Sequence, residues 1–135
     1  MVTVMPIELE LLAPPREPMS LVDGLAVAHP PELATHRFDP TQPRALADFL
    51  VWGVHDTGPG FVVAVAGPAA AVAVLCATVA ALTGADIEVA LAEPDEQRLA
   101  ALNPMAQDAV RERLRHLVVP DPQAVTDHLH ALGLR

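Results

Sequence analysis

The apolar stretch Phe61–Leu82, twenty-two residues without a charge, dominates the hydropathy pattern of the chain. Gly67-Pro68 interrupts this stretch, and proline inside a helix removes a backbone hydrogen bond and clashes with the preceding turn. We therefore expect a buried strand over Phe61–Ala66 and then a buried helix over Ala69–Thr83, ended by Gly84. A membrane-spanning helix is the alternative for a stretch of this length. The proline break and the lack of a flanking arginine cluster disfavour that alternative.

Alternation of apolar and polar positions predicts further strands on both sides of this stretch. Ile87–Leu91 reads as a short strand, so that Phe61–Leu91 becomes a parallel, right-handed βαβ unit. Ile7–Leu11 alternates apolar and acidic residues, which predicts a strand with one face in water. Leu21–Ala28 is also strand-like, and its Asp23-Gly24 pair is compatible with a tight hairpin turn or with a bulge in one longer strand.

Aspartate or asparagine followed by proline marks three predicted helix starts, at Asp39-Pro40, Asn103-Pro104 and Asp121-Pro122. A short helix ending near Leu102 is expected after Asp95. The apolar stripes of the three helices are Leu46, Phe49, Leu50 and Gly53, then Ala106, Val110, Leu114 and Leu117, then Val125, Leu129 and Leu132. The chain is thus predicted to be a single α/β domain over residues 1–135: a small sheet containing the parallel βαβ unit, flanking helices and a helical C-terminal third.

Charge and composition exclude several classes of function. The formal net charge is −9 with eight arginines and no lysine, which disfavours nucleic acid as a partner because such binding depends on neutralising phosphates. Cys76 is the only cysteine, so no disulfide forms within the chain, and its place in the apolar helix favours a core role. No secretory signal pattern opens the sequence, and we expect a cytoplasmic protein that does not bind a membrane.

Histidines and arginines are the other residues that could hold a metal ion or form a basic patch. His128 and His130 are two residues apart on a predicted helix and diverge by about 200°, so they do not chelate one ion. No metal site and no cofactor motif is recognised. Arg111, Arg113 and Arg115 alternate with acidic residues at helical spacing, a pattern typical of a solvated face.

The carboxyl ends of parallel strands are where α/β proteins bind ligands, and this rule selects the candidate site. The residues it selects are Gly67, Pro68, Ala69, Glu93 and Asp95, with His29 joining them if its strand is parallel to Phe61–Ala66. The first N–H groups of the Ala69 helix would accept an anion. The pattern lacks G-x-G-x-x-G, so it indicates a nucleotide site only weakly. The arrangement is similar to small Rossmann-like sensor domains at the level of the fold, which does not define a function.

Two functions are compatible with these features. The first is a small non-catalytic α/β module that acts by self-association, partner binding or ligand sensing. The alternative is a nucleotide- or phosphometabolite-binding protein, or a small enzyme, that uses the crevice between Gly67 and Glu93. Because the central helix is apolar on nearly all faces, part of it is expected to be covered by a second copy in a homodimer. Trp52, which lies off the apolar stripe of its helix, is the candidate contact residue.

Overall fold

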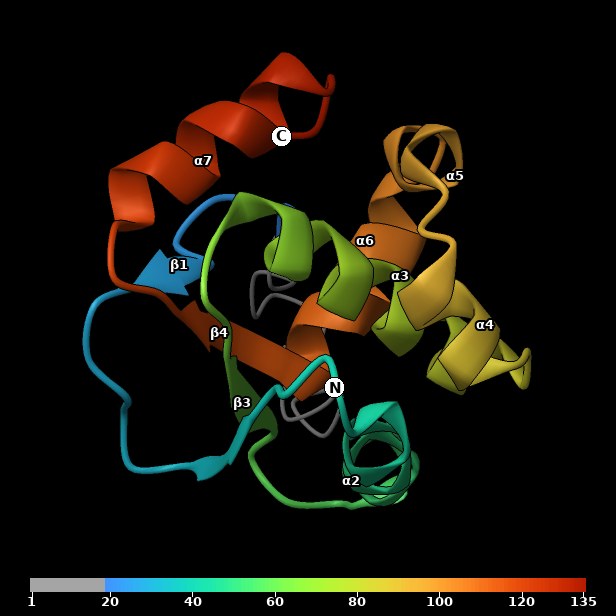
Figure 1. Ribbon diagram of the computed structural model, residues 1–135. Helices are drawn as coiled ribbons and strands as arrows, with labels where there is room; N and C mark the ends of the chain where they lie inside the picture. Colours follow the sequence, from blue (N-terminus) through green and yellow to red (C-terminus); the bar gives the residue numbers. More distant parts are fainter. Residues whose placement is uncertain (1–18) are drawn as a thin grey trace, which may run out of the picture.

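The computed structural model describes residues 19–135 (Figure 1). The predicted strand Ile7–Leu11 lies outside these residues. With the labels of Figure 1, the elements in chain order are β1 (Ala26–Val27), β2 (Ala34–Arg37), α2 (Pro43–His55), β3 (Phe61–Ala64), α3 (Pro68–Thr83), α4 (Ile87–Ala92), α5 (Glu96–Ala100), α6 (Pro104–Arg113), β4 (Leu114–Val118) and α7 (Pro122–Ala131). The predicted α/β class is confirmed.

The four described strands form one wholly parallel sheet in the order β1-β4-β3-β2. Helix α2 joins β2 to its neighbour β3, and the run from α3 to α6 joins β3 to its neighbour β4. Both connections are therefore βαβ crossovers. All four carboxyl ends meet at one edge of the sheet, where Val27, Arg37, Ala64 and Val118 are in register.

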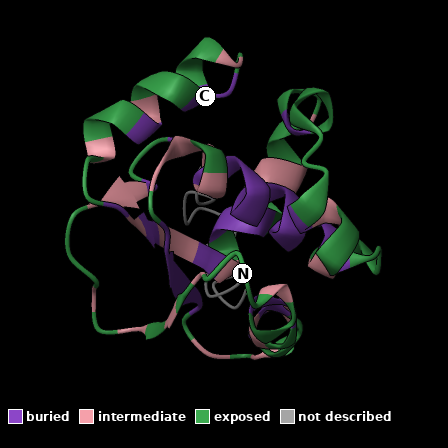
Figure 2. Cartoon of the chain, in the orientation of Figure 1, coloured by how far each residue is buried: buried purple, intermediate pink, exposed green. Residues whose placement is uncertain are grey.

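Helix α3 forms the centre of the core, as the hydropathy pattern predicts. It begins at Pro68 after the N-cap Gly67 and ends at Gly84, whose φ of 76° is the left-handed conformation that glycine adopts easily. Every residue over 71–80 is buried (Figure 2). Helices α2, α4, α5, α6 and α7 all contact α3, so most of its apolar surface is covered within the chain. Among the described residues, no helix has the length and apolar character needed to cross a membrane.

The prediction of a strand at Ile87–Leu91, the second strand of the βαβ unit, is wrong, because Ile87–Ala92 is helix α4. The Asp86 carboxylate caps this helix by accepting a hydrogen bond of 3.1 Å from the Val89 N–H. Ile87 and Leu91 are buried whereas Val89 is 52% exposed. The apolar residues of this segment stand at every second position, so Ile87 and Leu91 are four residues apart. In a helix such a pair lies on one face, and here that face packs against the core.

The true partner of β3 is β4, which the sequence analysis placed inside a helix. Only Val110 of the predicted stripe is buried within α6, and Leu114 and Leu117 are buried in the strand that follows. Strand β2 was not predicted. The helical C-terminal third is therefore interrupted by the central strand β4.

Helix α2 begins three residues later than predicted, at Pro43. Asp39 does not cap the helix. Its carboxylate accepts hydrogen bonds from the N–H and hydroxyl of Thr41, at 2.9 and 2.7 Å, and so closes a turn before the helix. The other predicted starts are confirmed, since Asn103 and Asp121 accept hydrogen bonds from Ala106 and Ala124.

The prediction of a solvated arginine face is also wrong for Arg111 and Arg113. Arg111 is 1% exposed, and its guanidinium donates to the carbonyls of Ser20, Asp23 and Arg115 at 2.8–2.9 Å. Arg113 donates to the carbonyls of Gly53 and Gly58, which belong to α2 and the turn after it. Both arginines therefore hold separate parts of the backbone together. They do not present charge to solvent.

Candidate functional site

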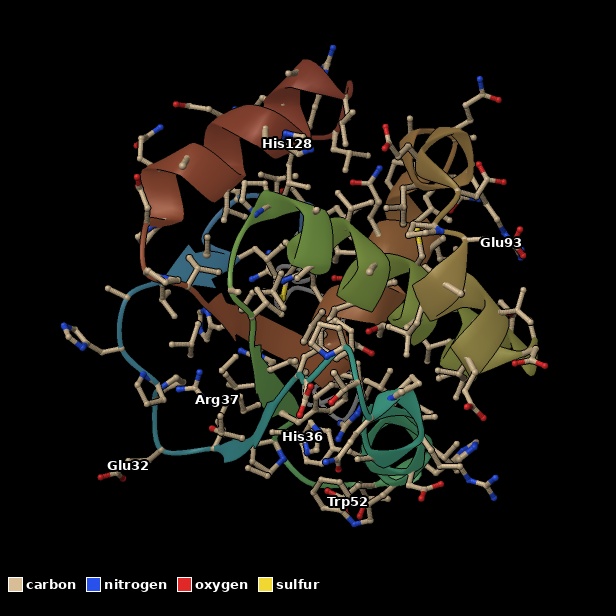
Figure 3. All side chains as sticks on the ribbon, viewed as in Figure 1. Glu32, His36, Arg37, Trp52, Glu93 and His128 are labelled. Carbon is tan, nitrogen blue, oxygen red and sulfur yellow. The ribbon has the colours of Figure 1, made fainter. Side chains whose placement is uncertain are left out.

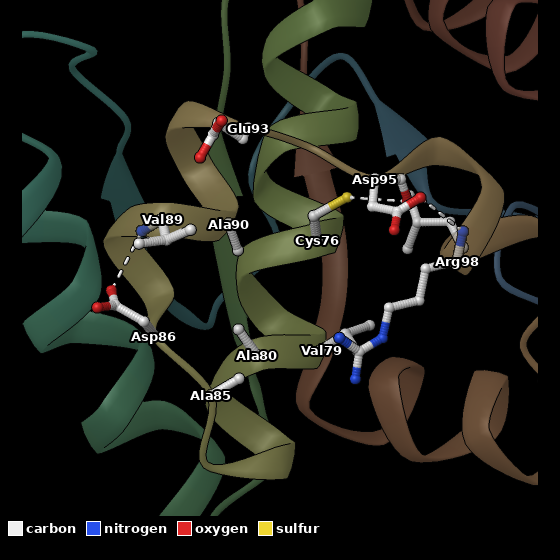
Figure 4. A pocket seen from close by; sticks show the side chains of 11 residues that line it. Cys76, Val79, Ala80, Ala85, Asp86, Val89, Ala90, Glu93, Asp95 and Arg98 are labelled. Atoms are coloured by element: carbon white, nitrogen blue, oxygen red, sulfur yellow. Dashed lines mark hydrogen bonds between the residues drawn. The ribbon is translucent and has the colours of Figure 1, made fainter.

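A pocket of about 210 Å³ lies between α3, α4 and α5 (Figure 4). Its walls are mainly apolar side chains: Val79 and Ala80 from α3, Ala85 from the turn, Val89 and Ala90 from α4, and Leu99 from α5. Helices α4 and α5, of six and five residues, both pack on α3, and the pocket lies between them. Their side chains leave part of the α3 surface open between them.

Four charged residues line this pocket, and two of them already have a structural role. The carboxylates of Asp86 and Asp95 cap α4 and α5, accepting hydrogen bonds from Val89 and Arg98 at 3.1 and 3.0 Å. The Glu93 carboxylate and the Arg98 guanidinium make no ion pair with another described residue. Figure 4 shows them on opposite sides of the opening. These two side chains are therefore available to a bound group.

Among the described residues, Cys76 contributes the one sulfur in the wall of the pocket. Its thiol donates a long hydrogen bond of 3.7 Å to the carbonyl of Asp95, which ties α3 to the start of α5. Burial, opposed in part by this hydrogen bond, raises the pKa of the thiol above its ordinary value of 9.0. A thiol held neutral in this way is a poor nucleophile, because the thiolate is the reactive form.

The residues of the predicted site are divided between two places. Glu93 and Asp95 line the pocket beside α4 and α5, because the segment before them is a helix and does not end at the sheet edge. Gly67, Pro68 and Ala69 begin α3, directly after β3 at the carboxyl edge. Figure 3 shows Glu93 far across the molecule from Arg37, which marks that edge. The predicted crevice between Gly67 and Glu93 is therefore not formed.

The carboxyl edge carries a groove of its own, of about 360 Å³. Most of its lining is apolar: Ala28, Ala64, Val65, Ala66, Val118, Val119 and Pro120. Arg37 is the one charged residue there within the described part of the chain. Sequence reasoning missed it because β2 was not recognised. His29 follows β1, which is parallel to the other strands, so its backbone reaches this edge as expected. The His29 side chain is not part of the groove lining.

Trp52 is 48% exposed and belongs to neither the pocket nor the groove. Its ring is tilted against Phe49 at a centroid distance of 5.5 Å, and Phe49 stacks on His36 of β2 at 5.1 Å. Trp52 and His36 lie near each other in Figure 3. Half of the indole therefore packs within the chain, and the other half is open to solvent.

Residues 19–135 form no candidate metal centre. Within this part of the chain, no three His, Cys, Asp or Glu side chains are close enough together to hold a metal ion. One feature of the sequence could have indicated the two short helices around the pocket. Asp86 and Asp95 stand three residues before Val89 and Arg98, which is the spacing of helix caps. Comparison with known proteins finds no family, no curated protein and no solved structure that matches the chain.

Proposed function

We propose that this protein is a non-catalytic binding module that recognises another protein by accepting an apolar side chain in the pocket between α3, α4 and α5. The pocket is the observation that supports this proposal. Sites for small organic ligands usually measure about 300–1,000 Å³, and about 210 Å³ is closer to the size of one or two side-chain groups. Exposed Val89 beside the opening extends the apolar contact area.

The polar groups around the pocket favour binding over catalysis. An active site needs an acid or base, a nucleophile and an electrophile that converge on one reacting atom. Here Asp86 and Asp95 are engaged as helix caps, and the pKa of the Cys76 thiol is raised by burial. Glu93 and Arg98 at the opening suit a different role, in which charged rim residues orient a partner around a central apolar contact.

Selection of short random peptides displayed on phage, followed by affinity measurement on purified protein, tests this proposal. Ala90→Phe places a ring at the pocket wall and should weaken binding of the selected peptides by more than about tenfold, as expected when a contact of roughly 2 kcal/mol is lost. Ala131→Phe on the exposed surface of α7 is the matched control and should leave affinity unchanged. Selected peptides that bind both variants equally would refute the proposed site.

Arg37 in the carboxyl-edge groove favours a second candidate function, which is binding of a phosphorylated metabolite. The space beside Gly67 is open, so a ligand can approach the backbone there. Thermal-shift screening with nucleotides and sugar phosphates tests it. A hit should be lost in Arg37→Gln and Gly67→Val, and a screen without hits removes this candidate.

Two further properties belong to the proposal. We place the protein in the cytoplasm, which suits a single reduced cysteine, and cell fractionation tests this. Self-association through Trp52 stays a prediction. It rests on the exposed half of the indole, because α3 is already covered within the chain. Light scattering should give a dimer mass that Trp52→Ala converts to a monomer mass.

A further inference from the structure

A second hollow, of about 300 Å³, lies on the other side of α4, between that helix and α2. Ala85 and Asp86 line both this hollow and the α3–α4–α5 pocket, so the two are adjacent. Val51 on α2 lines the second hollow and is 49% exposed. We call the two hollows and the ridge of α4 between them the α4 surface.

The α4 surface carries an excess of negative charge. The lining of the two hollows contains five carboxylates, on Asp48, Asp86, Glu88, Glu93 and Asp95, and two guanidinium groups, on Arg44 and Arg98. The formal excess is therefore three negative charges. No ion pair joins any of these seven residues to another described residue. Since Arg111 and Arg113 are turned inward, they do not offset this charge at the surface.

Two kinds of occupant are compatible with the apolar part of this surface, and charge separates them. A second copy related by a two-fold axis would place the same surface on both sides of the interface. Carboxylates would then face carboxylates, and like charges brought together oppose association. A segment that carries lysine or arginine around an apolar residue would instead neutralise the excess charge.

We infer that the α4 surface binds a basic, amphipathic segment of another protein, with one apolar side chain in the α3–α4–α5 pocket and a second against Val51. This inference rests on the proposed function, because it names the class of partner for the same pocket. The positive side chains of the segment lie beside Glu88 and Glu93, whose carboxylates have no described partner. The affinity therefore falls as salt concentration rises.

Two synthetic peptides of equal length test this inference. Both have leucine at the apolar positions of an amphipathic pattern, and the polar positions are all lysine in one peptide and all glutamate in the other. The lysine peptide should bind the protein and the glutamate peptide should not. Glu88→Gln combined with Glu93→Gln should weaken binding of the lysine peptide by about fivefold, which is the effect of losing two exposed ion pairs.

A matched double variant separates local contact from the general attraction between a basic peptide and an acidic protein. Glu32→Gln combined with Asp127→Asn removes the same charge from exposed positions in the β1–β2 loop and on α7. This control should change the affinity by less than about twofold, because exposed charges beyond the screening length interact weakly. Equal weakening by the two double variants would overturn the inference.

The outcomes also distinguish failure of this inference from failure of the proposed function. Peptides selected on phage that require an open pocket but carry no excess of lysine or arginine would refute the basic partner and leave the pocket proposal standing. Binding of the lysine peptide that Ala90→Phe does not affect would refute the pocket proposal. A dimer that Ala90→Phe dissociates would show that the occupant is a second copy, which also overturns the inference.

Discussion

Replacing Arg111 by methionine tests whether this buried side chain holds the Ser20–Asp23 segment against β4. The guanidinium donates three hydrogen bonds, to the carbonyls of Ser20, Asp23 and Arg115. Burial lowers the pKa of the Arg111 guanidinium below its ordinary value, which reflects the free energy needed to remove this charge from water. The variant keeps a long apolar stem in the core but leaves the three carbonyls without their donor.

The expected loss of stability follows from these contacts. A hydrogen bond to a charged group contributes about 1.5–3 kcal/mol, so three of them set an upper bound of roughly 4.5–9 kcal/mol. Desolvation of the guanidinium opposes this by several kcal/mol. The net loss in the free energy of unfolding should be about 3–5 kcal/mol, because each carbonyl left buried without its donor costs about 1–3 kcal/mol. A domain of ordinary stability, about 5–15 kcal/mol, would still fold.

Urea unfolding followed by circular dichroism measures this loss. Arg44→Met on α2 is the matched control, since Arg44 is exposed and makes no described ion pair, and its effect should stay within about 0.5 kcal/mol. A loss below about 1 kcal/mol for Arg111→Met, with an unchanged dependence on urea, would contradict the role assigned to Arg111.

Three further predictions concern the core. Leu75 is fully buried in α3, and Leu75→Ala should lower the free energy of unfolding by about 2–5 kcal/mol in urea. Gly53→Ala should be destabilising by about 1–2 kcal/mol, because the new Cβ would lie 2.5 Å from the buried Phe61 ring. This cost outweighs the better helix propensity of alanine. Gly67→Ala meets open space and should be neutral. The raised pKa of the Cys76 thiol means that the unfolded chain loses this proton first, so stability should fall as pH rises above the ordinary value of 9.0, and Cys76→Ala should lack this fall.

Each of these three predictions would be contradicted by one specific result. A loss under about 0.5 kcal/mol for Leu75→Ala would place that side chain at the surface. Equal effects of the two glycine substitutions would show that Phe61 does not press on α2. Identical alkaline pH profiles for wild type and Cys76→Ala would show that the native thiol titrates as it does in the unfolded chain.

Strong local signals predicted most of the helical part of the fold. The Gly67-Pro68 break and Gly84 fixed the limits of α3, and an aspartate or asparagine before proline marked α6 and α7 correctly. These signals are local, because a cap or a proline acts within one turn of backbone. Pairing between strands is not local. Strand β4 is central only because β1 and β3 bind on either side of it, and no feature within Leu114–Val118 specifies those neighbours.

Two residues of the pocket were predicted as site residues, but from an incorrect assignment of the segment before them as a strand. Glu93 and Asp95 do line the apolar pocket between α3, α4 and α5, but they reach it from a helix and not from the end of a strand. A five-residue alternation fits a strand and a short amphipathic helix equally well. Arg37 was missed because its strand has four residues, of which none is fully buried. Weak burial leaves little hydropathy signal in an edge strand.

Amide chemical shifts offer the most direct test of the central claim, that the binding site lies between α3, α4 and α5. A two-dimensional nitrogen–proton NMR spectrum of the labelled protein, recorded while the tightest phage-selected peptide is added, reports which amides change. We expect the largest changes within residues 76–99, which include the pocket wall and all of α4, with much smaller changes at the carboxyl edge. Changes concentrated at Ala64–Ala66 and Val118–Pro120, with residues 76–99 unaffected, would contradict this claim.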